Sequence, residues 1–242
     1  MKTSMHILSE ITDRIIRDLK PLRFKSPVAY VYNPLEYARK PYDIYIRRFG
    51  GPREIVLIGM NPGPFGMAQT GVPFGDVAMV RDWLGIEAEV GVPAKMHPKR
   101  PVQGFQCRRG EISGQRLWGW ARDRFGQPDR FFAKFFVANY CPLVFMEESG
   151  RNRTPDKLRP GEKAKLFAAC DKALVETVRA IEPKYVIGVG RFTADRIRIA
   201  LTDTGVQVGG ITHPSPANPK ANRGWAGVVE EEFHAMGIPL NP

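Results

Sequence analysis

Four short apolar segments alternate with segments of helical periodicity along this chain, and this alternation constrains its fold more than any other feature. The apolar segments are residues 54–58, 135–141, 184–190 and 207–212. Each has the length and the β-branched or aromatic content of a buried strand. Strands that alternate with helices form a mainly parallel sheet with helices on both faces. We therefore predict the α/β class: a single three-layer α/β/α domain, residues 1–242, around a central, mainly parallel four-stranded sheet.

Helical segments occupy most of the intervals between these strands. Leu8, Ile11, Ile15 and Leu19 recur at three- and four-residue spacing, which predicts an amphipathic helix over about residues 4–20 on the outside of the sheet. Further helices are expected over residues 76–84, over 113–125 with Ser113 as the N-cap, over 167–181, over 193–201 and near the C-terminus.

Three stretches show no clean period and are expected to be irregular: residues 27–51, 85–109 and 146–161. His97, in the second stretch, is expected to be exposed to solvent. Lys99 and Arg100 beside it could contact phosphate. The five tyrosines within residues 27–51 could stack on nucleic acid, but we favour a role in packing.

The loop over residues 59–75 follows the first strand directly and reads GMNPGPFGMAQTGVPFG. Ligands of open α/β sheets bind outside the carboxyl ends of the strands, so this loop is a candidate site, although a structural turn would have a similar composition. A phosphate-cradling loop is disfavoured because Pro62 and Pro64 remove two backbone N–H groups. We interpret the loop as a rigid wall that fixes Asn61 and leaves Gly63 without a side chain, which suits a flat ligand.

Two further polar side chains are expected at the same edge of the sheet. Asn139 ends the second strand, and His213 follows the last one. Carboxyl ends of parallel strands face one crevice, so Asn61, Asn139 and His213 are predicted to lie near one another. The amide of Asn139 presents an acceptor beside donors in one plane, which complements a pyrimidine edge with a carbonyl next to an N–H.

The third strand ends in Gly188 and Gly190, which form part of a dinucleotide-binding fingerprint. The fingerprint requires a third glycine where Thr193 stands. We therefore interpret these glycines as sites of close packing between strand and helix.

The charge balance favours a polyanionic partner. The chain has 36 Lys and Arg against 25 Asp and Glu, a net charge of +11. Nucleic acid is the leading candidate, and a generically basic protein is the alternative.

The cysteines and histidines indicate neither a disulfide framework nor a metal site. The chain has three cysteines, Cys107, Cys141 and Cys170, and no two of them are close in the sequence. An odd number of widely spaced cysteines favours a reducing compartment. The spacing of the Cys and His residues matches no zinc or iron–sulfur pattern, so we expect no metal and no cofactor. No signal peptide or run of about 18 apolar residues is found. We expect a monomer without membrane association in the cytoplasm, at the nucleoid of a bacterium or in the nucleus of a eukaryote.

The loop over residues 59–75, together with HPSPANP at 213–219 and ANRGW at 221–225, closely resembles the single-strand-selective monofunctional uracil-DNA glycosylases. Residues 32–37, 79–85, 97–101 and 139–143 also resemble this family, so the resemblance covers most of residues 27–225. The Asn-Pro-Gly core alone is shared with mismatch-specific relatives. The whole loop is far more specific.

The resemblance implies a uracil-DNA glycosylase-like fold and a role in base excision repair of DNA. In that reaction a uracil flips into a pocket and its N-glycosidic bond is hydrolysed, which leaves an abasic site. By similarity, Asn61 positions the attacking water and His213 stabilises the negative charge that develops on uracil O2. Substrate-binding residues implied by the resemblance are Met60, Gly63, Phe74, which stacks on the ring, and Asn139, which reads the base edge. The implied DNA contacts are Pro214, Ser215, Pro216, Ala217, Asn218, Lys220 and Arg223.

Three positions depart from related motifs. The classical uracil glycosylases have Asp and Tyr where this chain has Asn61 and Gly63. We expect weaker activation of water, and space near C5 that admits 5-substituted uracils such as 5-hydroxymethyluracil. Ala217 stands where the family commonly places Arg in the wedge that enters the duplex. A methyl group cannot fill the vacated base position, so duplex flipping or product retention is expected to be weaker.

Two other functions stay open at this stage. One is a non-catalytic nucleic-acid-binding protein that keeps the pocket, and the other is a nucleotide hydrolase that acts on free nucleosides. Salt-sensitive DNA binding is expected of the glycosylase and of the non-catalytic protein alike, so binding cannot separate them. Only cleavage of a uracil-containing strand can.

Overall fold

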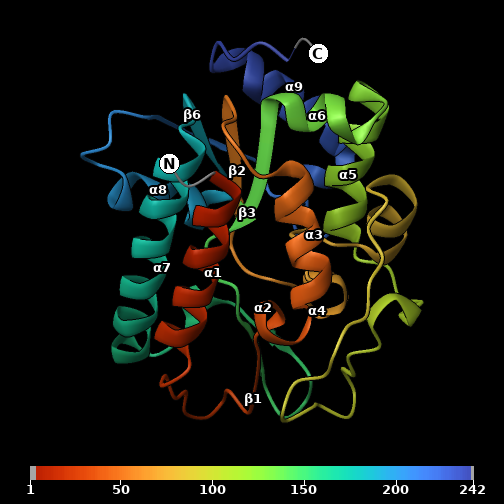
Figure 1. Ribbon diagram of the computed structural model, residues 1–242, viewed down its shortest axis with the longest axis vertical. Helices are drawn as coiled ribbons and strands as arrows, with labels where there is room; N and C mark the ends of the chain where they lie inside the picture. The colour runs from red at the N-terminus through yellow and green to blue at the C-terminus, as the bar shows by residue number, and fades with distance from the viewer. Residues whose placement is uncertain (1–3, 241–242) are drawn as a thin grey trace.

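The computed structural model describes residues 4–240, and a four-stranded parallel sheet lies at its centre (Figure 1). Its strands are β2 (Ile55–Gly59), β3 (Phe135–Asn139), β6 (Tyr185–Val189) and β7 (Gln207–Ile211), in the order β3-β2-β6-β7. Every pairing in this sheet is parallel. The predicted α/β class and central four-stranded sheet are confirmed. Residues 1–3 and 241–242, which the predicted domain includes, lie outside the described residues.

The strand order creates a crevice at one edge of this sheet. The chain passes from β2 to β3 on one side and then returns to the other side of β2 to form β6 and β7. A reversal of this kind opens a ligand-binding crevice outside the carboxyl ends of the strands. Because β2, β3 and β7 end at Gly59, Asn139 and Ile211, the segments that carry Asn61, Asn139 and His213 meet at this edge.

Alternate side chains of β3 contact helices on opposite faces of the sheet. Phe136 packs against Tyr45 of α3 (Arg39–Phe49), with ring centroids 5.6 Å apart. The neighbouring Phe135 lies 6.0 Å from Trp120 of α5 (Ile112–Phe125) and 6.0 Å from Phe233 of α9 (Trp225–Ala235). This alternation is the two-residue period of a strand buried on both faces. The sheet is therefore the middle of three layers.

Most of the other predicted helices are confirmed, although the one expected over residues 167–181 begins at Pro160 and residues 76–84 hold only a short π-helical turn. Helix α3 contradicts the expectation that residues 27–51 are irregular. Helix α1 (Ser4–Leu19) buries the predicted stripe of apolar residues and lies beside α7 (Pro160–Ile181) (Figure 1). Helix α8 (Arg191–Ala200) connects β6 to β7. The short helical elements are α2 (Pro34–Tyr37), α4 (Met67–Thr70), the π-helical turn η1 (Met79–Trp83), η2 (Gly104–Gln106), α6 (Pro128–Lys134), η3 (Pro155–Lys157) and η4 (Ala221–Arg223).

Parts of the stretches expected to be irregular form a second, antiparallel sheet. Strands β1 (Tyr30–Tyr32), β4 (Val144–Met146) and β5 (Asn152–Arg153) pair in the order β1-β4-β5. Strands of two or three residues are too short to show a period in the sequence. Tyr32 and Tyr45 are fully buried, which confirms the packing interpretation for these two tyrosines.

The expectation that His97 is solvated is wrong, because its ring is buried beside this second sheet. The ring centroid lies 4.5 Å from that of Tyr30. Nδ1 accepts a hydrogen bond from the backbone N–H of Lys99 (2.9 Å), and Nε2 lies 3.0 Å from the carbonyl oxygen of Glu148. These partners are backbone groups, so the polar and proline-rich sequence around His97 did not indicate them.

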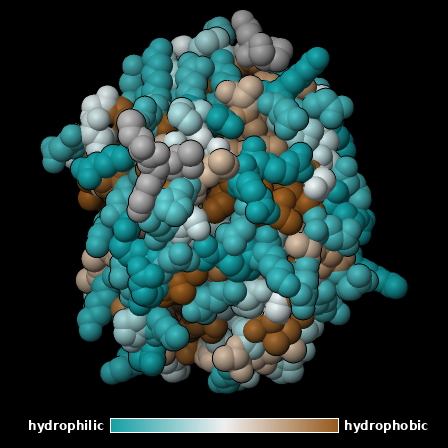
Figure 2. All heavy atoms as spheres, in the orientation of Figure 1, coloured by the Kyte–Doolittle hydropathy of each residue, from teal (hydrophilic) through white to brown (hydrophobic). Residues whose placement is uncertain are grey.

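Gly188 confirms the predicted close packing of strand and helix. A Cβ at this position would lie 2.3 Å from the backbone nitrogen of Ala194, so only glycine fits. On the face shown in Figure 2, hydrophilic residues predominate and hydrophobic ones form small groups. Within residues 4–240, no helix is both long and apolar enough to cross a membrane.

Candidate active site

A crevice of about 530 Å³ lies outside the carboxyl ends of the parallel strands. It is lined by all the predicted catalytic and substrate-binding residues, which are Met60, Asn61, Gly63, Phe74, Asn139 and His213, and by two of the predicted DNA contacts, Ser215 and Pro216. The remaining predicted contacts, Pro214, Ala217, Asn218, Lys220 and Arg223, belong to the same loop but do not line the crevice. The fold thus brings segments that are far apart in the sequence into one site.

The amide group of Asn61 has a fixed orientation. Its Nδ2 donates to the carbonyl oxygens of Leu143 (3.1 Å) and Pro62 (3.3 Å). Two carbonyl acceptors on one side can be satisfied only by the NH₂ end of the amide. No protein donor bonds to Oδ1 within residues 4–240, so this oxygen is left as an acceptor in the crevice. It can hold a water molecule through one of the water's protons.

His213 presents a neutral hydrogen-bond donor to the crevice. Its Nδ1 accepts a hydrogen bond from the backbone N–H of Ser215 (3.0 Å), which places the single proton of the neutral ring on Nε2. Burial lowers the pKa of His213 to about 4. The ring rests on Gly190, where a Cβ would lie 3.2 Å from the Cβ of His213. At neutral pH the ring can therefore donate a hydrogen bond without carrying charge.

This environment predicts how His213 titrates. The ordinary pKa of histidine is about 6.5, so in the unfolded chain the ring takes up a proton as the pH falls through that value. In the folded protein the ring takes up its proton only near pH 4. The free energy of unfolding therefore decreases as the pH falls from about 6.5 to about 4, because the unfolded chain binds the proton first. We expect the ring-nitrogen NMR signals of His213, assigned by their loss in His213→Asn, to show the Nε2–H tautomer at pH 5.5. A titration of these signals with a midpoint near pH 6.5 would contradict the lowered pKa of His213.

The polar amide of Asn139 and the ring of Phe74 meet at the end of β2. A Cβ at Gly59 would lie 2.5 Å from Asn139 Oδ1 and 2.7 Å from Phe74 Cε2, so glycine at this position allows both groups to approach the strand. Asn139 Nδ2 lies 3.2 Å from the sulfur of Met67, a weak acceptor that a stronger one can replace. An amide edge beside an aromatic face is suited to a planar polar ring.

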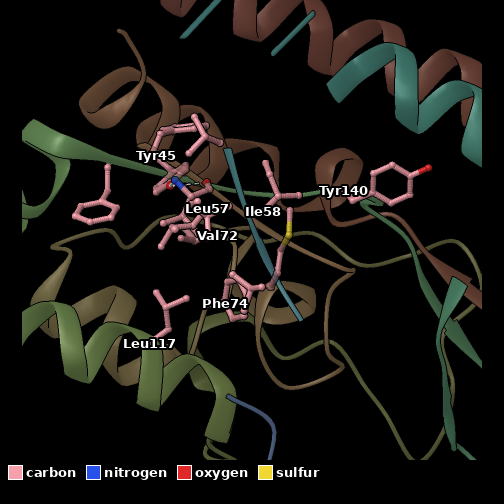
Figure 3. Close-up of a cluster of buried hydrophobic side chains, with 14 of the residues drawn as sticks. Tyr45, Leu57, Ile58, Val72, Phe74, Leu117 and Tyr140 are labelled. Carbon is pink, nitrogen blue, oxygen red and sulfur yellow. Dashed lines mark hydrogen bonds between the residues drawn. The ribbon is translucent and has the colours of Figure 1, made fainter. Parts of the chain in front are cut away.

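Phe74 is held by its backbone and by the core. It has a left-handed backbone conformation, with φ of 52°, which is uncommon for a residue other than glycine. Its carbonyl oxygen accepts a hydrogen bond from Trp118 Nε1 (3.0 Å). In Figure 3, Phe74 lies on the side of Val72 that faces Leu117, away from Tyr45. Its ring centroid is 6.3 Å from that of His213, so the stacking face and the donor belong to one pocket.

The structure corrects the predicted cap of α5 and adds a carboxyl group to the crevice. Glu111 is the N-cap, and its side chain accepts a hydrogen bond from the backbone N–H of Gly114 (3.0 Å), whereas Ser113 is buried in the first turn. Glu111 lines the crevice next to Gly63, and burial raises the pKa of its carboxyl group. Glutamate is not among the residues preferred at the N-cap, so residue type favoured Ser113 and did not indicate Glu111.

The loop that follows His213 is anchored by α5. Arg116, which the sequence did not single out, donates to the carbonyl oxygen of Pro214 (2.9 Å) and to Asn222 Oδ1 (2.9 Å). The ammonium group of Lys220 pairs with Glu232 at 2.7 Å, which reduces the charge it can offer a phosphate. Arg223 and Ala217 are exposed on the same loop.

Among residues 4–240, no three His, Cys, Asp or Glu side chains gather in a way that could hold a metal ion. The three cysteines are buried and free.

Known proteins resemble this chain in family, in sequence and in fold. Residues 50–229 match the uracil DNA glycosylase superfamily. A single-strand selective monofunctional uracil DNA glycosylase from Bos taurus is 47% identical over 228 residues, which are 93% of this chain and 84% of the bovine protein. Its counterpart from Rattus norvegicus is 47% identical, with 93% of this chain and 82% of the rat protein covered. The crystal structure of wild-type SMUG2 from Pedobacter heparinus has a TM-score of 0.65 at 15% identity, covers 94% of this chain and 97% of its own, and shows the shared fold.

Proposed function

Because this chain belongs to the uracil DNA glycosylase superfamily and, within it, to the single-strand selective monofunctional enzymes, we propose that it excises uracil from DNA. It hydrolyses the N-glycosidic bond of the flipped nucleotide and leaves an abasic site for later steps of repair. The observation that carries this proposal is the presence, in one crevice, of an oriented acceptor on Asn61 and a neutral donor on His213.

His213 acts on the leaving group. As the bond between C1′ and N1 breaks, electrons move onto the base and negative charge grows on O2. A donor already oriented in a partly dry crevice stabilises that charge without reorganisation. The Nε2–H of His213 is such a donor. Because burial keeps the ring neutral, it has no acidic imidazolium proton to transfer, and it stabilises the anion by hydrogen bonding.

Asn61 acts on the nucleophile, and Asn139 and Phe74 hold the base. The free Oδ1 of Asn61 accepts a hydrogen bond from the water that attacks C1′, which orients the water without deprotonating it; the water loses its proton to solvent once its oxygen has bonded to C1′. The Asn139 amide pairs with N3–H and O4 of uracil, and it exchanges its weak contact with the Met67 sulfur for the O4 carbonyl. Phe74 stacks on the ring. No pair of carboxylates is needed, unlike in glycosidases that act on sugars.

A cleavage assay tests the proposal. A labelled single-stranded oligonucleotide with one uracil, incubated with the protein and then with alkali, is expected to break at the uracil, and a matched strand with thymine is expected to stay intact. An unbroken uracil strand at high protein concentration would favour the non-catalytic DNA-binding alternative. Hydrolysis of free deoxyuridine at a comparable rate would favour the nucleoside-hydrolase alternative.

We further propose that Gly63 admits substituents at C5 of uracil. The three atoms nearest to a Cβ at Gly63 would all belong to the side chain of Glu111, the closest at 3.7 Å, so an alanine fits while a larger side chain must enter the crevice. Gly63→Tyr is expected to reduce excision of 5-hydroxymethyluracil at least tenfold more than excision of uracil, roughly the effect of a clash of 1–3 kcal/mol in a pocket. Gly63→Ala is the matched control and is expected to retain both activities. Equal losses on both substrates in Gly63→Tyr would contradict this role.

We propose that uracil in single strands is the better substrate and that the protein acts as a monomer. Ala217 is exposed on the loop beside the crevice, and its methyl group is too small to take the place of a flipped base in a duplex. A single strand has no stacked partner strand to replace, so the absence of a wedge matters less there.

A further inference from the structure

Two arginines lie over the ring of Phe65 at the crevice, on a different segment of its wall from the loop that carries His213. The guanidinium carbon of Arg109 is 4.1 Å from the ring centroid of Phe65, and that of Arg100 is 5.4 Å from it. Phe65 and Arg109 both line the crevice. We call Phe65, Arg100 and Arg109 the Phe65 cluster. None of these residues has a role in the mechanism given above.

The charges of the Phe65 cluster are not neutralised by the protein. Neither guanidinium forms an ion pair with a carboxylate within residues 4–240. The hydrogen bond of the Arg100 side chain runs to the carbonyl oxygen of Lys99 (2.8 Å). By contrast, Lys220 on the other loop pairs with Glu232, and the partly buried Arg153 pairs with Glu147 at 2.7 Å. Two unpaired cations close together at a crevice repel each other, which indicates a site for an anion.

The cluster rests on a fixed support. The carbonyl oxygen of Arg100 accepts a hydrogen bond from the hydroxyl of Tyr32 (2.9 Å), a fully buried residue of β1. Contact with the ring of Phe65 orients the guanidinium groups by a cation–π interaction, and apart from the one that Arg100 donates to Lys99 it leaves their N–H donors available to a ligand. Less side-chain entropy is then lost when a ligand binds.

We propose that the Phe65 cluster binds a phosphodiester group next to the flipped uracil in single-stranded DNA. This inference rests on the proposed function and assigns a substrate subsite to it. A strand whose uracil occupies the pocket must leave the crevice in two directions, and the 213–223 loop and the Phe65 cluster stand on different segments of its wall. A phosphate matches the planar, forked donors of two guanidiniums. Ala217 cannot act as a wedge, and Lys220 is paired with Glu232. The phosphate contact at the Phe65 cluster therefore contributes a large part of the affinity for single-stranded DNA.

Charge removal at the cluster tests this inference. The variant is Arg100→Gln/Arg109→Gln, and the matched control is Arg122→Gln/Arg198→Gln, which removes two exposed arginines that pair with Asp123 and Asp195 outside the crevice. Binding of a single-stranded uracil oligonucleotide is measured by fluorescence anisotropy over a series of NaCl concentrations. The cluster variant is expected to bind about tenfold more weakly. Because one phosphate is no longer neutralised, the negative slope of log K against log salt should become shallower by about 0.7. Its KM for excision should rise more than its kcat falls.

The outcomes separate this inference from the function on which it rests. If the wild-type protein excises uracil but the cluster variant has the salt slope and KM of the control, the cluster is not a phosphate subsite. If the wild-type protein does not excise uracil while the cluster variant still shows the lower slope, the proposed function fails and the anion site stands. Phe65→Leu, which keeps an apolar side chain, is a second variant. It is expected to weaken binding in the same direction with a smaller change in slope, and a full loss of binding at an unchanged slope would indicate base stacking instead.

Discussion

His213→Ala is expected to slow uracil excision by about 100- to 1,000-fold, the usual loss when one donor to a developing anion is removed. The imidazole is neutral because burial lowers its pKa to about 4, so its contribution is a single oriented N–H. That donor gains strength only as charge builds on O2. The loss should therefore fall on the rate of the chemical step, measured under single-turnover conditions, and only slightly on the affinity for DNA.

Two further substitutions separate the donor from the structural role of the ring. Nδ1 of His213 also accepts a hydrogen bond from the backbone N–H of Ser215, so alanine removes a loop contact together with the donor. Asparagine can replace the Nδ1 acceptor but cannot reach the position of Nε2. Glutamine can reach that position with its amide NH₂. We expect His213→Asn to be as slow as His213→Ala, and His213→Gln to recover part of the rate. Recovery in His213→Asn instead would mean that the loop contact, rather than the donor, limits the reaction.

The main sheet and the crevice could be predicted from the sequence because both depend on local patterns. The apolar segment that forms β2 is completely buried, and its composition already indicates a central strand. Parallel strands present their carboxyl ends at one edge, so the residues that follow β2, β3 and β7 had to meet there. The resemblance to a family added the roles of Asn61 and His213, which residue type alone could not assign.

The features that were missed depend on contacts between segments distant in sequence. Arg116 bonds to Pro214 across 98 residues, and His97 lies beside the carbonyl of Glu148 across 51 residues. Most of these partners are backbone carbonyl groups. Because every residue carries such a group, the sequence does not indicate which one a side chain will contact. The cap of α5 was missed for a different reason. Serine is a preferred N-cap residue and glutamate is not, so residue type favoured Ser113, whereas the helix begins at Ile112 with Glu111 as its cap.

Asn61→Ala is expected to slow excision by about 100-fold, a typical loss when a reacting group is no longer positioned. The water would still enter the crevice but would lose the acceptor that aligns it with C1′. The substitution also removes the Nδ2 hydrogen bonds to Leu143 and Pro62, yet both acceptors are carbonyl oxygens at a crevice that water can reach. Folding and binding of DNA should thus change little, which a thermal melt and an anisotropy titration can check. A rate within threefold of the wild-type rate would place the water-positioning group elsewhere.

Asn61→Asp is a sharper test, because aspartate occupies this position in the classical uracil glycosylases and is a stronger base. In this protein one carboxylate oxygen would face the carbonyl oxygens of Leu143 and Pro62, where Asn61 now donates. Three acceptors facing one another repel, so the side chain should rotate away or take up a proton. We therefore expect Asn61→Asp to be slower than the wild-type protein at neutral pH and to gain activity as the pH is lowered enough to protonate it. A variant faster than wild type at pH 8 would show that the Leu143 contact does not hold residue 61 in its working orientation.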